Sequence, residues 1–273
     1  MLSPDHPATP FILAVALLAL LAGLVVNAVL KDRREYRRFK LLRTSRRRRK
    51  VFRRWLLQSL ALFGGSSVVT LLLSWQFIPL LLDDINQWGW IVDARLAFES
   101  NTLVAGLTTG AIVAIVVVGT LGILAARPKP GDTAEIPAIG DIQALLPRNR
   151  AELKYGALLS INAGVVEELL FRLAVPAMLF GITGSSVAAV TVSLAIFALL
   201  HLYQGVAGVL GSLLIGAVLM AVYVATGSIL VAIIVHALFD LRSLVLIPVV
   251  VFRVHRETGD NAPPRAVKIA KAD

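Results

Sequence analysis

The 273-residue sequence contains no cysteine. Its absence excludes a disulfide framework, a thiolate nucleophile and thiolate metal ligands. Histidine is scarce as well, with four residues, and the 17 acidic residues are outnumbered by 27 Lys and Arg. Carboxylates and imidazoles are therefore few, and their positions carry much of the functional information.

Charged residues of both signs make up only 16% of the chain, whereas hydrophobic residues make up 57%. Soluble domains carry about 25% charged and about 45–50% apolar residues, so this composition suits a lipid bilayer. A membrane-spanning helix needs roughly 20 mostly apolar residues. Because open sheets cannot satisfy their backbone in hydrocarbon, we expect an all-α fold, a polytopic transmembrane helical bundle. Seven runs are long enough, at residues 11–30, 55–82, 102–126, 155–181, 184–203, 205–226 and 228–252.

The net charge of +10 is unevenly distributed along the chain. Fourteen of the 27 Lys and Arg lie in residues 31–54, whereas the stretch 83–101 holds only Arg95. The positive-inside rule places such a basic loop in the cytoplasm, so we expect the N-terminus outside. The segments 127–154 and 253–273 are also basic, and seven crossings put both of them, with the C-terminus, on the cytoplasmic side.

Basic residues follow the first apolar run, 11–30, and none precedes it. This order is the reverse of a cleavable signal peptide, so we expect a retained first helix. The block "RRRRK" at residues 46–50 lies beside a predicted membrane helix, where basic clusters attract anionic lipid. Membrane lipid is therefore the expected partner of this block, and nucleic acid is not.

Composition divides the chain into four parts. Residues 1–126 contain the first three predicted helices, with the basic loop 31–54 in the cytoplasm. A cytoplasmic connector rich in Pro and Gly follows at 127–154. Four helices at 155–252 hold the unusual polar residues and form the predicted core. The polar tail 253–273 has two adjacent prolines, and we expect it to be disordered.

The fourth predicted helix carries three charges in the stretch "EELLFR". Glu168 and Arg172 are four residues apart, so they share a helix face and can pair. Glu167 points about 100° away, toward a neighbouring sector. A charge at the centre of a membrane helix costs about 2.5–3.5 kcal/mol on insertion scales. These side chains must therefore face one another or a watery interior rather than lipid.

Two further predicted helices carry polar residues at helical spacing. The stretch "FALLH" places Phe197 one turn before His201, and "HALFD" places His236 one turn before Asp240. Ionisable residues inside membrane helices are functional by default, and purely structural pairing is the alternative. We expect the polar residues of the three helices to meet inside the bundle.

In order and spacing, these three stretches resemble the motifs of the CPBP family, the CAAX-protease and bacteriocin-processing (Abi-type) group of intramembrane proteases. The family pattern has two glutamates with an arginine four after the second, then Phe with His four later, and His with Asn or Asp four later. The resemblance covers about residues 150–250. Leu173 stands where Gly commonly follows the arginine, and Asp240 is a bacterial variant of the Asn in eukaryotic prenyl-protein enzymes. The resemblance implies a protein of the bacterial inner (plasma) membrane whose catalytic core is 155–252.

The resemblance implies an endopeptidase that hydrolyses a peptide bond near the cytoplasmic side of the membrane. Peptide hydrolysis needs a base for water, donors for the oxyanion and an acid for the leaving amine. Glu167 is the predicted base, and His201 holds the same water or moves its proton. His236, with Asp240 one turn away, is predicted to stabilise the oxyanion. The supporting residues are Glu168, Arg172 and Phe197.

A metal site is the alternative way to activate water. One Glu and two His can form a three-ligand zinc site with water in the fourth position, and the ligands here would be Glu167, His201 and His236. The H-E-x-x-H signature is absent from the sequence. Members of the family have been described both as metalloproteases and as metal-free, glutamate-dependent enzymes. We expect metal-free chemistry with no cofactor, and zinc is the alternative.

Two other functional classes compete with the protease. Acidic and His residues on neighbouring helices also form the relays of proton-coupled transporters, although no internal repeat supports that class here. The other class is a non-catalytic relative that binds a membrane partner or confers immunity to a peptide. For the protease, the expected substrate is a peptide or protein, free or membrane-attached. The sequence does not indicate an oligomeric state.

Overall fold

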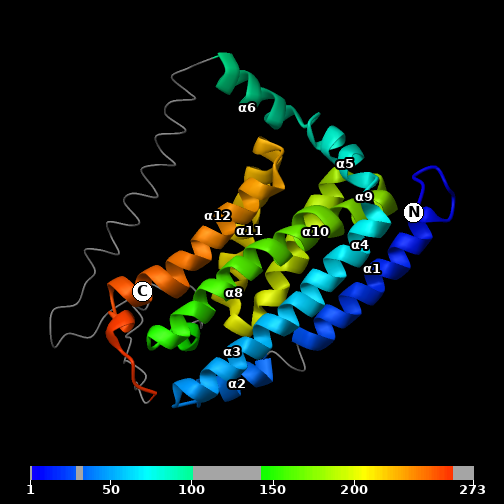
Figure 1. The fold of residues 1–273 in the computed structure, drawn as a ribbon. Helices are drawn as coiled ribbons and strands as arrows, with labels where there is room; N and C mark the ends of the chain where they lie inside the picture. Colours follow the sequence, from blue (N-terminus) through cyan, green and yellow to red (C-terminus); the bar gives the residue numbers. More distant parts are fainter. Residues whose placement is uncertain (1, 29–32, 101–142, 261–273) are drawn as a thin grey trace.

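The computed structural model describes residues 2–28, 33–100 and 143–260 (Figure 1). Within these ranges the chain is helical and forms no strand, which confirms the predicted all-α bundle. The predicted third run, 102–126, lies outside them. Five described helices are long and apolar enough to cross a membrane, namely Thr9–Val26, Ser45–Ser74, Ser186–Gln204, Val206–Thr226 and Ile229–Val250.

The N-terminal part contains six α-helices among the described residues. The π-helical turn η2 (Leu60–Gly64) joins the third of them to the fourth without a break. The six are α1 (Thr9–Val26), α2 (Arg33–Lys40), α3 (Ser45–Ser59), α4 (Gly65–Ser74), α5 (Phe77–Ile85) and α6 (Gly89–Ser100).

The segment predicted as a basic cytoplasmic loop, 31–54, contains helices where the structure describes it. They are α2 and the first part of α3, which begins at Ser45, ahead of the predicted apolar run that starts at residue 55. Arg and Lys are good helix formers, and Thr44, in an extended conformation with φ −95° and ψ 136°, marks the helix start. The continuous helix formed by α3, η2 and α4 ends at Ser74, so the last part of the predicted run 55–82 lies in a separate helix, α5.

The C-terminal part forms helical hairpins that match the last four predicted runs. The turns after α9 and α11 contain Gly184 and Gly227, with φ of +66° and +64°, which are conformations that favour glycine. The elements are η3 (Gln143–Leu145), α8 (Arg150–Glu168), η4 (Leu169–Ala174), α9 (Val175–Thr183), α10 (Ser186–Leu200), η5 (His201–Gln204), α11 (Val206–Thr226), α12 (Ile229–Leu241), η6 (Arg242–Leu246), α13 (Ile247–Val250) and η7 (Val254–Arg256).

Helix α8 lies in the middle of the bundle, between α3 and α4 on one side and α12 on the other (Figure 1). Gly164 makes the approach to α12 possible. A Cβ atom at this position would lie 2.9 Å from the carbonyl oxygen of Ile233 and 3.0 Å from the backbone nitrogen of Ala237. The absence of a side chain at Gly164 therefore allows α8 and α12 to pack closely. The short distance between them lets side chains of one helix contact those of the other.

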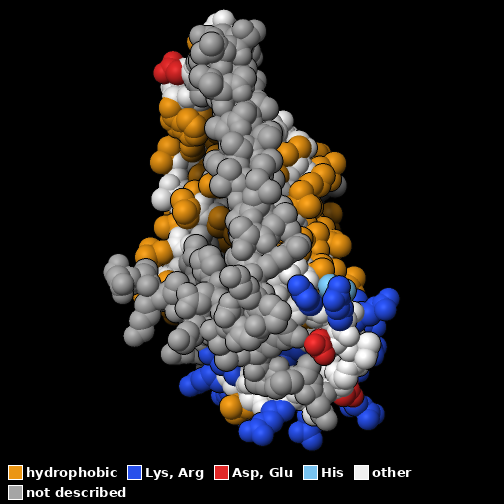
Figure 2. Space-filling view, turned by 90° about the vertical axis from the view of Figure 1, so that its left-hand side faces the viewer, with side chains coloured by type: hydrophobic (Ala, Val, Ile, Leu, Met, Phe, Trp, Pro, Cys, Tyr) orange, Lys and Arg blue, Asp and Glu red, His pale blue; other side chains and the backbone are white. Residues whose placement is uncertain are grey.

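The described parts of the three basic segments meet at one end of the molecule. Arg148 Nη1 donates to the carbonyl of Leu42 at 2.9 Å, and the backbone N–H of Ser45 donates to the carbonyl of Asp260 at 2.9 Å. Figure 2 shows the Lys and Arg side chains gathered at this end, beside a broad surface of exposed hydrophobic side chains. Helix α6 lies at the opposite end (Figure 1).

The tail predicted to be disordered at 253–273 has a defined position as far as Asp260. Besides the Ser45 contact, the Arg150 N–H donates to the carbonyl of Glu257 at 3.0 Å, so the tail packs on the start of α8. The predicted connector, 127–154, likewise ends in helix, because α8 begins at Arg150. The rest of both segments lies outside the described residues.

The close contact at Gly164 predicts the effect of adding one methyl group there. Overpacking a tight contact costs about 1–3 kcal/mol, so Gly164→Ala should lower the free energy of unfolding, measured by denaturant titration in mild detergent. The control is Gly65→Ala, because no atom lies within 4 Å of a Cβ at that helical position. Equal stability of the two variants would contradict the proximity of α8 and α12.

Candidate active site

The stretch "EELLFR" lies where α8 gives way to the π-helical turn η4. π-helical turns frequently occur at functional sites. They also disturb the regular backbone ladder, and hydroxyl groups from neighbouring helices hydrogen-bond to carbonyls on both sides of the junction. Ser193 Oγ donates to the carbonyl of Phe171 at 2.7 Å, and Ser67 Oγ donates to that of Val166 at 3.3 Å. Ser193 of α10 thus supports the turn that carries the motif.

Glu168 and Arg172 form the predicted ion pair inside the protein. Glu168 Oε2 lies 3.1 Å from Arg172 Nε, and both side chains are fully buried. The two atoms do not meet the angles of a hydrogen bond, so the contact is mainly Coulombic. Arg172 Nη2 also donates to the carbonyl of Gly216 at 3.3 Å, and its guanidinium lies 4.4 Å from the ring centroid of Phe197. Three helical segments therefore hold this one cation.

Glu168 also contacts His236, which the sequence did not predict. The His236 Nδ1 atom lies 2.7 Å from Glu168 Oε1, and the side chain of His236 is buried. Because a carboxylate accepts, Nδ1 carries the proton. On the other side of the ring, Nε2 lies 3.8 Å from Asp240 Oδ2. Of the two carboxylates beside the imidazole, Glu168 makes the shorter contact.

Glu167 lies beside this cluster without joining it. Its side chain is half-buried, and no hydrogen bond or ion pair engages it within the described structure. Its carboxylate still interacts electrostatically with Arg172, His236 and Asp240. The two adjacent glutamates thus have different environments: Glu168 is held between two partners, whereas Glu167 is a nearby carboxylate whose oxygens are available to another group.

His201 reaches the cluster indirectly. Helix α10 ends at Leu200, and His201 begins the short 3₁₀ turn η5. Its Nδ1 atom lies 2.9 Å from the carbonyl of Phe197, which can only accept, so Nδ1 is the donor and Nε2 is left for another group. The rings of Phe197 and His201 lie 4.8 Å apart. No direct polar contact joins His201 to either glutamate in the described part of the chain.

The zinc alternative finds no matching geometry in the described residues. They contain no group of three His, Asp or Glu side chains arranged to hold one metal ion. Glu167, His201 and His236 therefore do not form a ligand set as they are placed, and Nδ1 of His236 is already engaged by Glu168.

Comparison with protein families matches the segment that contains this site. Residues 149–242 match the family described as type II CAAX prenyl endopeptidase Rce1-like. They form an Rce1-like domain. The domain begins at the N-cap of α8 and ends just after α12, so it contains every motif residue discussed above, and it confirms the resemblance to the CPBP/CAAX protease family. No curated protein and no solved structure matches the chain.

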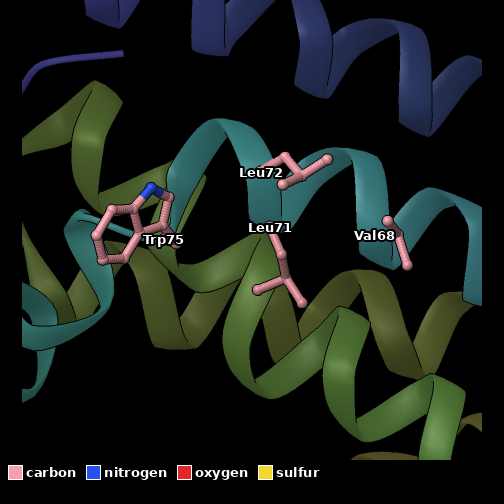
Figure 3. A pocket seen from close by; sticks show the side chains of 4 residues that line it. All are labelled: Val68, Leu71, Leu72 and Trp75. Atoms are coloured by element: carbon pink, nitrogen blue, oxygen red, sulfur yellow. The ribbon is translucent and has the colours of Figure 1, made fainter. Parts of the chain in front are cut away.

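An open pocket of about 360 Å³ lies outside the Rce1-like domain. Figure 3 shows that its four lining side chains project from α4 and from the residue directly after it. All four are hydrophobic, so the pocket offers no group for acid–base chemistry and is not part of the polar site. The lining residues are Val68, Leu71, Leu72 and Trp75.

The buried Glu168–Arg172 pair in the Rce1-like domain can be tested by a double-mutant cycle. Breaking a buried ion pair on one side costs about 3–5 kcal/mol, because the other charge is left uncompensated. Arg172→Met should therefore lower the free energy of unfolding by about that amount, and adding Glu168→Gln should recover part of the loss. Arg256→Met, at an exposed position, is the control and should be near neutral. Additive effects of the Arg172 and Glu168 changes in detergent unfolding experiments would contradict the coupling.

Proposed function

We propose that this protein is an intramembrane endopeptidase that hydrolyses a peptide bond near the cytoplasmic side of the membrane. The observation that carries the proposal is the bridge that Glu168 forms between Arg172 and His236. The bridge fixes a histidine, and the adjacent Glu167 makes no hydrogen bond or ion pair with the residues that the structure describes. The Rce1-like domain and the apolar helices support the same conclusion.

Glu167 is the proposed general base. A base must be close to the reacting water and must not be fully engaged by other donors. Glu167 satisfies the second condition, since its carboxylate makes no hydrogen bond or ion pair in the part of the chain that the structure describes. In the proposed reaction it takes a proton from water, and the resulting hydroxide attacks the carbonyl carbon of the scissile bond.

His236 is the proposed electrophilic partner, with Asp240 beside it. Because Nδ1–H is directed at Glu168, Nε2 is the ring atom that can face a substrate. Donation from Nε2 requires the imidazolium form, and the carboxylates of Glu168 and Asp240 on either side of the ring favour a positive charge there. A fixed N–H directed at the developing oxyanion stabilises the tetrahedral intermediate.

His201 is proposed to complete the proton transfers. Its Nδ1–H is held by the carbonyl of Phe197, so the neutral ring presents Nε2 as an acceptor. In that state it can receive the proton that Glu167 takes from water and return it to the leaving amine as the carbon–nitrogen bond breaks. Phe197 would position this residue and Arg172 together, because its ring contacts both side chains.

The proposed setting is a bacterial inner membrane with the N-terminus outside and the C-terminus in the cytoplasm. The positive-inside rule supports it, since the described parts of the basic segments share one end. The proposed substrate is a peptide or protein, free or membrane-attached. The proposed chemistry is metal-free and uses Glu167 as the activating group.

The predicted loss of activity in Glu167→Gln tests the proposal. General base catalysis contributes about 10²–10⁴-fold, so cleavage should fall by that factor while the protein remains folded and inserted. The measurement is an unbiased comparison of newly formed peptide ends in membranes that contain the native protein, the variant or neither. The matched control is Glu257→Gln, an exposed position outside the Rce1-like domain.

Each outcome of this comparison has a definite meaning. Peptide ends that appear only with the native protein and with Glu257→Gln would support the peptidase and identify its substrate. Equal patterns in all membranes, with both proteins shown to be folded, would refute it. A proton flux that depends on Glu167 would then favour transport, and an unaffected partner-binding function would favour a non-catalytic role.

A further inference from the structure

A dense basic surface lies at the end of the molecule where α2 and the first part of α3 fold against each other. We call residues 33–54 the basic collar. Glu35 is the only acidic residue in the collar, and it pairs with Arg54 at 3.2 Å. Figure 2 shows the basic side chains of the protein gathered at this end. The exposed basic residues of the collar are Arg34, Arg37, Arg38, Lys40, Arg43, Arg46, Arg47, Lys50, Arg53 and Arg54.

The collar is continuous with a candidate membrane-spanning helix. Helix α3 passes through η2 into α4, and the resulting helix, Ser45–Ser74, contains an apolar stretch long enough to cross a bilayer. Along this helix, large exposed apolar side chains begin just after the last basic residue of the collar, with Leu57 55% and Leu60 48% exposed. We therefore expect the basic residues of this helix to lie at the level of the lipid headgroups. Anionic headgroups attract such juxtamembrane clusters.

The inner face of the collar is packed onto α8. Arg48, fully buried, pairs with Glu152 at 3.1 Å in the first turn of α8, and its guanidinium lies 4.4 Å from the ring centroid of Phe39. The ring of Phe52 stacks on that of Tyr155, also in α8, at 6.3 Å. One buried ion pair and a cluster of aromatic rings thus join the collar to the helix that carries Glu167 and Glu168.

A second contact leads from the collar to His201. Tyr36 of α2 packs edge-on against Tyr203 of η5, with ring centroids 5.9 Å apart. Tyr203 in turn stacks on His201 at 6.2 Å. The turn that holds His201 has a glycine directly after it, Gly205, with φ of +85°. Packing against α2 therefore supports a short non-α-helical turn.

We propose that the basic collar binds the anionic headgroups of the membrane, and that this contact holds Tyr36 against Tyr203 and so fixes the position of His201. The first half concerns binding alone, whereas the consequence for catalysis rests on the proposed peptidase function. Anionic lipid is the favoured occupant over RNA because the collar continues directly into an apolar helix, which keeps it at the membrane surface.

Lipid binding is tested with the full-length protein in neutral detergent, titrated with fluorescent phosphatidylglycerol or fluorescent phosphatidylcholine. We expect the anionic lipid to bind more tightly and its affinity to fall with salt. The triple variant Arg46→Gln, Arg47→Gln and Lys50→Gln should weaken phosphatidylglycerol binding by about tenfold or more. The charge-preserving control, Arg46→Lys, Arg47→Lys and Lys50→Arg, should keep native affinity.

Competition experiments identify the source of the bound phosphate group. Failure of inorganic phosphate and of a short RNA to displace the labelled lipid at equal concentration would support a membrane-surface site. Displacement by phosphate would overturn it in favour of an isolated anion site, and displacement by RNA would overturn it in favour of a nucleic-acid surface. Equal affinity for both lipids, or an unaffected triple variant, would also overturn it.

Coupling to His201 is tested in lipid nanodiscs with and without phosphatidylglycerol. The readout is the imidazole nitrogen resonances, assigned with His201→Gln. We expect anionic lipid to change the His201 signal in the native protein, and to leave it unchanged in the triple variant and in Tyr36→Leu. An equal response in all three would overturn the coupling.

Cleavage in the same discs separates this inference from the proposed function. A cleavage rate that rises with phosphatidylglycerol in the native protein alone would support the coupling. A cleavage rate that is the same with and without the lipid, and in the native and variant proteins, would overturn it. If the lipid changes the His201 signal but no disc shows cleavage, the coupling stands and the peptidase fails.

Discussion

The carboxylate of Glu168 is the point on which the arrangement of the core helices depends. It is fully buried and lies against both Arg172 and His236, so it joins two helical segments that are distant in sequence. A charge in such a setting is tolerated only with close partners, because the low dielectric that strengthens its interactions also penalises an unpaired group. Arg172 extends the constraint to the Gly216 carbonyl and the Phe197 ring. The positions of α8, α10, α11 and α12 are thereby linked.

The contacts that sequence could predict are those within one helix. Glu168 with Arg172, Phe197 with His201, and His236 with Asp240 are each four residues apart, and helical periodicity alone brings such residues together. The structure shows contacts within all three pairs. Hydropathy located the described membrane helices for a similarly local reason, because lipid imposes a composition on any segment that crosses it. It misplaced the start of α3, since basic residues lower the hydropathy of a segment while remaining good helix formers.

The contacts that sequence did not reveal run between helices. The bond from His236 to Glu168 depends on the relative depth and rotation of α8 and α12, which no spacing within either helix specifies. Gly164 is the nearest sequence signal, because a residue without a side chain permits the close approach that the bond needs. The contact between Arg172 and the Gly216 carbonyl could not be predicted either, because every residue type has a backbone carbonyl. The contact between Tyr36 and Tyr203 joins one segment that precedes α8 in the sequence to another that follows it. Helical periodicity cannot predict it either.

The adjacent glutamates show why a membrane site separates structural and chemical roles. A carboxylate that anchors two helices is held against its partners, and Glu168 is in this position. A carboxylate that activates water must lie near the same charged groups without forming an ion pair with them. One residue along a helix changes the direction of a side chain by about 100°, which is enough to move Glu167 out of the pair while it stays within electrostatic range of Arg172 and His236. Because the two residues are adjacent in the sequence, the contacts that hold Glu168 in place also fix the backbone position of Glu167.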